Sequence, residues 1–180
     1  MKKSIILDID GTLISAGIGK KIGSDFTIMI YKDSFSIFKR PYLNEFLDFC
    51  FKKFEYVIIW SAAEKKYIDL IIQNIFLKDK PHIVWTRDKC ENIIDINYEY
   101  TFIKPLRKFI RCFKKYNFNY SNLFIIDDMP ETARLNKFNF IQIKSFDGNE
   151  NDDKLKILIN YLSKIKNYED IRLICYNFNN

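Results

Sequence analysis

The stretch SIILDIDGT, residues 4–12, decides the fold. An apolar run between Ser4 and Ile9 ends in acidic residues, which is typical of a buried strand in a parallel sheet. Asp8 and Asp10 lie two residues apart, so on an extended chain their side chains point the same way. Ligands of open α/β sheets bind beyond the carboxyl ends of the strands. We therefore expect Asp8 and Asp10 to face one site at that edge.

Apolar runs and helical patterns alternate along the rest of the chain. Further buried strands are expected from Tyr56 to Trp60, from Asn122 to Ile126 and from Phe140 to Ile143. Helices are expected between and after them: behind Pro41, around Tyr67 to Ile75, from Pro105 to Phe113, and as a last long helix capped by Asn151 or Asp152. This alternation predicts an α/β, Rossmann-like parallel sheet with helices on both faces.

The segment between the first strand and the first helix predicts a loop and a hairpin. Three of the five glycines lie between Ile14 and Ser24, which favours a loop. Over residues 25–39, two apolar runs flank a short polar turn, which is a hairpin signal. We expect this hairpin to be a small insertion on the main sheet.

A second small insertion is expected in the middle of the chain. Short strands at His82 to Thr86 and at Ile93 to Phe102 place it at about residues 82–102. Neither insertion is long enough to form a large cap domain. Residues 1–180 are therefore expected to be a single domain whose site stays open.

Composition limits the class of protein. Hydrophobic residues make up 48% and charged residues 29% of the 180 residues, and no apolar run approaches the roughly 18 to 20 residues of a membrane span. The four cysteines form no CxxC pair, and the one histidine, His82, cannot build a multi-histidine metal site. We expect an intracellular protein of the cytoplasm or nucleus, without a disulfide framework, a signal peptide or a membrane anchor.

The basic charge balance points to an acidic partner. The net charge is +6, which suits a phosphoprotein, a nucleic acid or an anionic lipid. The lysines are dispersed along the chain, and a bias of the coding sequence toward Lys, Asn and Ile would give the same charge. Nucleic acid is therefore the less favoured partner.

Two carboxylates side by side repel each other unless a cation joins them. Mg²⁺ is a hard cation that takes oxygen ligands and commonly bridges carboxylates to phosphate. The alternative is an acidic turn with Gly11 at a positive φ angle. Asp127 and Asp128, Ser61 and Lys104 stand at other expected strand ends or helix starts. Each alone has a structural explanation, but together they predict a phosphate site with a metal.

This pattern resembles the haloacid dehalogenase (HAD) superfamily of aspartyl-phosphate phosphatases. The sequences DIDGT, from Asp8 to Thr12, and DD at Asp127 and Asp128 are similar to its first and fourth motifs, with Ser61 and Lys104 as the second and third. The chain most resembles one branch, the RNA polymerase II C-terminal-domain phosphatases or NLI-interacting-factor domain. The stretches FKRPYLNEFL (38–47), RDKC (87–90) and LFIIDDMP (123–130) carry that resemblance.

Some positions depart from the branch. Gly11 follows the second aspartate where the branch usually has Glu, Ala63 stands where it usually has Ser, and Met129 precedes Pro130 where it usually has Ser. Both carboxylates of the first motif are retained. These departures affect the expected substrate preference more than the expected chemistry.

The resemblance implies a role for each site residue. Asp8 is the expected nucleophile and Asp10 the expected acid and base, while Thr12 orders the loop. The expected ligands of Mg²⁺ are Asp8, the Asp10 carbonyl, Asp128 and, directly or through water, Asp127. Ser61 and Lys104 are expected to hold the phosphate, and Arg87 a peptide substrate or its phosphate.

The expected function is therefore a Mg²⁺-dependent phosphatase of phosphoserine or phosphothreonine in a protein, such as a polymerase-tail peptide. The hairpin carries apolar residues that either contact this peptide or complete the core: Phe26, Ile28, Ile30, Phe35 and Ile37. Two other functions stay open at this point. One is hydrolysis of a small metabolite or a nucleic-acid 3′-phosphate, and the other is an inactive docking domain.

Overall fold

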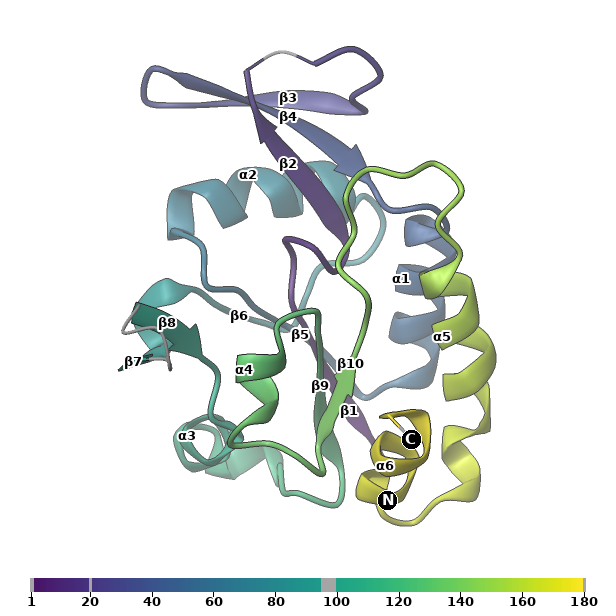
Figure 1. The fold of residues 1–180 in the computed structure, drawn as a ribbon. Coiled ribbons are helices and arrows are strands. Elements are labelled where there is room, and N and C mark those ends of the chain that lie inside the picture. Colours follow the sequence, from purple (N-terminus) through teal and green to yellow (C-terminus); the bar gives the residue numbers. More distant parts are fainter. Residues whose placement is uncertain (1, 20, 95–99, 180) are drawn as a thin grey trace.

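The computed structural model describes residues 2–19, 21–94 and 100–179 (Figure 1). The main sheet has five parallel strands in the order β10-β9-β1-β5-β6. Their bounds are β1 Ser4–Leu7, β5 Tyr56–Trp60, β6 Ile83–Trp85, β9 Leu123–Asp127 and β10 Phe140–Gln142. The helices are α1 Leu43–Lys53, α2 Lys65–Ile75, α3 Leu106–Cys112, α4 Pro130–Ala133, α5 Lys154–Leu162 and α6 Ile171–Asn179. The parallel α/β architecture predicted from the sequence is confirmed.

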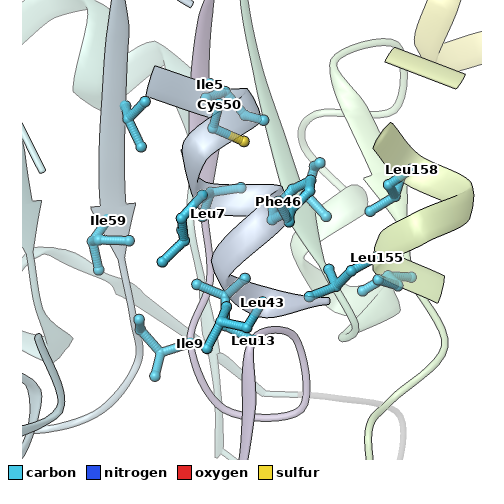
Figure 2. Packing of buried hydrophobic residues seen from close by; sticks show 14 of the residues in the cluster. Ile5, Leu7, Ile9, Leu13, Leu43, Phe46, Cys50, Ile59, Leu155 and Leu158 are labelled. Carbon is cyan, nitrogen blue, oxygen red and sulfur yellow. The ribbon is translucent and has the colours of Figure 1, made fainter. Parts of the chain in front are cut away.

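One hydrophobic core lies between the sheet and the pair of helices α1 and α5. Successive residues of a strand point to opposite faces, so Ile5 and Leu7 of β1 face this core. Helix α1 presents Leu43, Phe46 and Cys50 at helical spacing toward them, and α5 adds Leu155 and Leu158, as Figure 2 shows. This packing covers one face of the sheet at the first strand.

A second core covers the opposite face and is rich in aromatic residues. Ile6 of β1 points into it, beside Trp60 of β5 and Trp85 of β6. The two indole rings meet edge to face, with centroids 4.8 Å apart, and Phe109 of α3 packs on both. Helices therefore cover both faces of the sheet, as expected, and each strand end is held from two sides.

Two small antiparallel sheets are inserted into this layer. Strands β2 Ile14–Ile18, β3 Phe26–Ile30 and β4 Asp33–Lys39 form one, in the order β2-β4-β3, above α2 in Figure 1. Strands β7 Glu91–Ile94 and β8 Tyr100–Ile103 form the other. The hairpin expected over 25–39 is confirmed, as β3 and β4.

Three expectations about the elements were wrong. The glycine-containing segment after Ile14 begins with a strand, β2, because Ile14 to Ile18 pairs with Phe35 to Lys39 of β4. The strand at 83–85 belongs to the main sheet, so only β7 and β8 are inserted there; the expected strand over 93–102 partly lies outside the described residues. The helix expected to be last, α5, ends at Leu162 and is followed by a 3-10 turn at Ser163–Asn167 and a separate helix, α6. The N-cap residue of α5 is Asp153, not Asn151 or Asp152.

Among the described residues, no helix is both long and apolar enough to cross a membrane. Cys50, Cys90, Cys112 and Cys175 are free thiols, so the described chain holds no disulfide between them.

Candidate active site

The parallel register brings the predicted site residues to one edge of the sheet. Leu7 of β1 lies opposite Ile59 of β5 and Ile126 of β9. Asp8, Ser61 and Asp127 come one or two residues later on these three strands. The carboxyl ends of adjacent parallel strands meet at one edge, so these side chains gather there. The sequence could predict this grouping because each of these strands is a local apolar run.

Lys104 lies buried between two carboxylates. Its Nζ contacts Asp8 Oδ1, and it donates a hydrogen bond to Asp127 Oδ2 at 2.6 Å. Burial alone would lower the pKa of Lys104, but the charges of Asp8 and Asp127 outweigh burial and raise that pKa above its ordinary value. Burial also raises the pKa of Asp8, and the Lys104 ammonium opposes this rise. Lys104 therefore stays positively charged in the site.

Three of the carboxylates can converge on a cation. One oxygen from each of Asp8, Asp127 and Asp128 lies within 4.8 Å of the others. Of the described cations, Lys104 alone forms an ion pair with this group, and it reaches only Asp8 and Asp127. An all-oxygen, net negative donor set is what a hard divalent cation such as Mg²⁺ prefers. The residues present therefore fit the expected metal.

Asp10 is held by a tyrosine that the sequence analysis treated only as part of a helix. Tyr67 of α2 donates its phenolic hydrogen to Asp10 Oδ1 at 2.5 Å. Burial raises the pKa of Asp10, and the Tyr67 hydrogen bond opposes that rise. Burial, together with the nearby Asp10, raises the pKa of Tyr67 as well. The tyrosine therefore acts as a neutral hydrogen-bond donor that fixes the Asp10 carboxylate.

Gly11 and Thr12 position the loop and the neighbouring Asp128. Gly11 has φ +76°, and a Cβ atom there would lie 2.3 Å from Asp128 Oδ2. The buried Thr12 hydroxyl donates to Asp128 Oδ1 at 3.4 Å. Burial raises the pKa of Asp128, and a hydrogen bond from Ser145 opposes the rise. Thr12 is expected to order the loop, and its hydroxyl also contacts the Asp128 carboxylate.

Arg40 holds this loop through hydrogen bonds to its backbone, and the sequence did not indicate it as a site residue. The arginine is fully buried and forms a two-pronged ion pair with Asp152, at 2.8 and 3.0 Å. Its remaining hydrogens go to the backbone carbonyls of Gly11, Thr12 and Lys144. Asp152 also accepts the backbone N–H of Lys154, the first residue of α5. This ion pair thereby joins the loop at Gly11 and Thr12 to the last third of the chain.

Ser61 and Arg87 border the same cavity, which has a volume of about 370 Å³. The buried Ser61 Oγ accepts the backbone N–H of Ala63 at 3.0 Å, which leaves its own hydroxyl hydrogen to donate. Arg87 is half-exposed; its Nε donates to the Ala62 carbonyl and its guanidinium lies 5.3 Å from the Phe102 ring centroid. The cavity is also lined by the other site residues, Asp8, Asp10, Lys104, Asp127 and Asp128.

An apolar groove adjoins this cavity. It has a volume of about 330 Å³, shares Asp10 and Arg87 with the cavity, and continues over Ile18, Ile30 and Phe35 of the three-stranded sheet. Ile28 and Ile37 are buried in the core, while Ile30 and Phe35 also line the groove, so contact of the hairpin with a peptide stays a prediction.

The comparisons with known proteins agree with this geometry. A family model described as NLI interacting factor-like phosphatase matches residues 3–172. A CTD phosphatase-like protein of Invertebrate iridescent virus 6 is 34% identical over 165 residues, which cover 84% of this chain and 90% of that protein. The CTD small phosphatase-like protein 2 of Dictyostelium discoideum is 30% identical over 95% of this chain, but this covers only 29% of that protein.

Two solved structures share the fold. The RNA polymerase II CTD phosphatase Fcp1 aligns with a TM-score of 0.61 at 20% identity, over 98% of this chain and 52% of that one. Fission yeast Fcp1 bound to beryllium fluoride aligns with a TM-score of 0.58 at 18% identity, over 93% of this chain and 51% of that one. The chain therefore spans about half the length of these solved relatives.

Proposed function

We propose that this chain, which belongs to the family of NLI interacting factor-like phosphatases, hydrolyses phosphoserine or phosphothreonine esters in a protein substrate by way of a phosphorylated Asp8. Membership of the family makes the chain a phosphatase, and the resemblance inferred from its motifs is confirmed. One observation carries the proposal: Asp8, Asp10, Lys104, Asp127 and Asp128 line a single cavity at the carboxyl edge of the sheet.

The first step transfers the phosphoryl group to the enzyme. A carboxylate oxygen of Asp8 attacks phosphorus, a bond from Asp8 to phosphorus forms, and the bond to the seryl or threonyl oxygen breaks. Asp10, held by Tyr67, gives its proton to that leaving oxygen. The products of this step are the free hydroxyl side chain and aspartyl-phosphate at Asp8.

The second step regenerates the enzyme. Asp10, now ionised, takes a proton from water while the water oxygen attacks phosphorus. The bond between phosphorus and Asp8 breaks, inorganic phosphate is released, and Asp10 is protonated again. Each turnover therefore uses one water molecule and returns both carboxyl groups to their starting state.

The remaining residues would bind the metal ion and the phosphate oxygens. Asp8, Asp128 and the Asp10 carbonyl would hold Mg²⁺, with Asp127 contributing directly or through water. When bound, the metal would neutralise charge on the phosphate oxygens. The Lys104 ammonium and the Ser61 hydroxyl line the cavity and would contact the same oxygens.

The apolar groove supports a protein rather than a small metabolite as the substrate. The groove is continuous with the phosphate cavity through Asp10, Ala63 and Arg87. A proline next to the phosphorylated residue would fit there, because it packs without a backbone donor. Arg87 could then donate a charge-assisted bond to the peptide or its phosphate. The names of the relatives, CTD phosphatases, are consistent with this class of substrate.

A substrate panel tests this proposal. We expect Mg²⁺-dependent turnover of an aryl phosphate, and a higher kcat/KM for a phosphoserine-proline peptide than for a nucleotide or 3′-phosphorylated DNA. Turnover should cease in excess chelator and return with added Mg²⁺. Activity that persists undiminished in chelator would contradict the metal assignment. A preference for nucleotides or DNA over every phosphopeptide would contradict the substrate class.

A further inference from the structure

The solvent-facing side of α3 carries a run of positive charge. Five residues, which we call the α3 basic face, lie on this helix and on the 3-10 turn Lys114–Tyr116 that follows it: Arg107, Lys108, Arg111, Lys114 and Lys115. The chain contains no acidic residue from Thr101 to Ile126. The opposite side of α3 is anchored in the aromatic core by Leu106 and Phe109. The basic residues are therefore presented on a rigid support.

Most of this charge is not neutralised within the described residues. Arg107 lies 3.6 Å from Glu91 of β7, and both side chains are at least one-third exposed. For the other four members of the α3 basic face, the described part of the chain provides no ion-pair partner. An exposed pair such as Arg107 with Glu91 is weak and is screened by salt. The face thus keeps a positive potential.

This arrangement is unfavourable for the helix itself. Arg107 and Arg111 are four residues apart on α3, so like charges are neighbours on the helix surface. Arg107 and Lys108 also stand in the first turn, at the positive end of the helix dipole, where cations are disfavoured. A helix that needed only to be soluble would be more stable with mixed charges. An anionic partner would offset this cost.

The helix that carries the α3 basic face is connected to the phosphate cavity by the chain and by hydrogen bonds. Helix α3 begins two residues after Lys104. Asn136 accepts the N–H of Leu106 at 3.0 Å and donates to the Lys104 carbonyl, so one side chain ties the helix to the site. The same Asn136 side chain donates to the carbonyl of Thr132 in α4, and Thr132 lines the cavity. The start of α3 therefore lies beside the phosphate cavity.

We propose that the α3 basic face binds an acidic or additionally phosphorylated stretch of the protein substrate, on the same chain as the phosphate that is hydrolysed. This inference rests on the proposed function. From Arg107 to Lys115 the face extends roughly 12 Å along the helix axis. An extended peptide covers that length with about four residues. The substrate should therefore carry several negative charges over about four residues, at a short distance from the hydrolysed phosphate.

The test compares two phosphopeptides that differ only in their tails. Both carry one phosphoserine-proline, followed after a short spacer by four glutamates in one peptide and four glutamines in the other. The variant is Arg111→Glu with Lys115→Glu. The matched control is Lys52→Glu with Lys164→Glu, two exposed lysines of α1 and the segment after α5, which changes the net charge equally. Turnover of an aryl phosphate, which has no tail, shows whether each variant is folded and active.

We expect the wild type to favour the glutamate tail by about tenfold in kcat/KM at low salt, and less at high salt. The Arg111 and Lys115 variant should lose this preference, and the control variant should keep it. Equal rates for the two tails in the wild type, or a preference that survives the charge reversal, would overturn the inference. The inference would also be overturned if the two tails gave equal rates and a single-stranded oligonucleotide competed with the substrate through Arg111 and Lys115.

Binding separates this inference from the proposed function. Fluorescence anisotropy with the Asp8→Asn protein measures the affinity of both peptides without turnover. If the glutamate tail binds more tightly than the glutamine tail, and the charge-reversal variant loses this difference, the α3 basic face is supported. This holds even if the wild type hydrolyses neither peptide. That combination would contradict the proposed substrate alone. Hydrolysis of both peptides with no tail-dependent binding would contradict the α3 basic face alone.

Discussion

At the scale of single residues, the site depends on a small number of contacts that hold carboxylates in place. Asp10 shows this most clearly, because its proposed role as acid and base requires a fixed orientation toward the leaving oxygen. Tyr67 supplies that orientation through the 2.5 Å hydrogen bond from its phenol. A general acid contributes to rate only within hydrogen-bond reach of the oxygen that it protonates.

Tyr67→Phe should therefore lower kcat on an aryl phosphate by roughly 10-fold to 100-fold, because a small misplacement of a catalytic group has an effect of that order. KM should change little, since the tyrosine hydroxyl is committed to Asp10. The control is Tyr161→Phe in α5, which removes a hydrogen bond of 2.8 Å to the Ile174 carbonyl far from the cavity. Wild-type kcat in the Tyr67 variant would show that Asp10 needs no such support.

At the scale of elements, β2 determines what lies beside the phosphate cavity. Its pairing with β4 places Ile18 at the rim of the apolar groove, with 78% of the residue exposed. Ile28, by contrast, is buried, so a charge at Ile28 would damage the core rather than test the groove. Ile18 is thus the better position at which to test peptide binding.

Ile18→Asp should raise KM for a phosphoserine-proline peptide about tenfold, because it places a negative charge in the groove beside an anionic substrate. The rate on an aryl phosphate, which does not enter the groove, should be nearly unchanged. Ile22→Asp is the matched control, since Ile22 is fully exposed and lies outside the groove. Equal effects of the two variants on the peptide would mean that the peptide binds elsewhere.

The Arg40 and Asp152 pair connects elements that are distant in the sequence, and its strength should depend on pH. Burial acts to raise the pKa of Asp152, but hydrogen bonds from Arg40 and from the Lys154 backbone outweigh it and hold that pKa below its ordinary value. The unfolded chain therefore binds this proton more readily than the folded one. The stabilisation is complete above the ordinary pKa of about 4 and is lost as pH falls through the lower, folded value.

Asp152→Asn should lower the free energy of unfolding by about 3 kcal/mol at pH 7, because it leaves Arg40 buried without a counter-ion. Urea unfolding should show this difference shrinking as the pH falls below about 4. Asp153→Asn, at the exposed neighbouring position, should have little effect at either pH. A difference for Asp152→Asn that does not vary with pH would mean that packing, not charge, stabilises this junction.

At the scale of the whole molecule, local sequence patterns predicted the sheet and the acidic edge but not the long-range supports. The strands β1, β5 and β9 are short apolar runs that end at polar residues, so their positions along the chain and their ends could be inferred. Lys104 was placed at the site by its position just before the Pro105 helix, and the resemblance to a family added its role. Tyr67 and Arg40 escaped because their partners, Asp10 and Asp152, lie 57 and 112 residues away along the chain.

The wrong element assignments have equally specific causes. Glycines at 17 and 19 indicated a loop, yet Gly17 lies inside β2, where the pairing with β4 outweighs local preference. The short strand β6 was interpreted as part of an insertion, because three residues carry no sign of which strand they pair with. Tertiary pairing, which single-sequence patterns do not contain, decided both cases.

The central claim is that Asp8 carries the phosphoryl group during turnover. The most direct test is to mix the enzyme with Mg²⁺ and a ³²P-labelled phosphopeptide, quench in acid within milliseconds, and locate the label by peptide mapping. We predict an acid-stable, base-labile acyl-phosphate in the peptide that contains Asp8, and no label in Asp8→Asn. A label on another residue, or wild-type turnover by Asp8→Asn, would contradict the account.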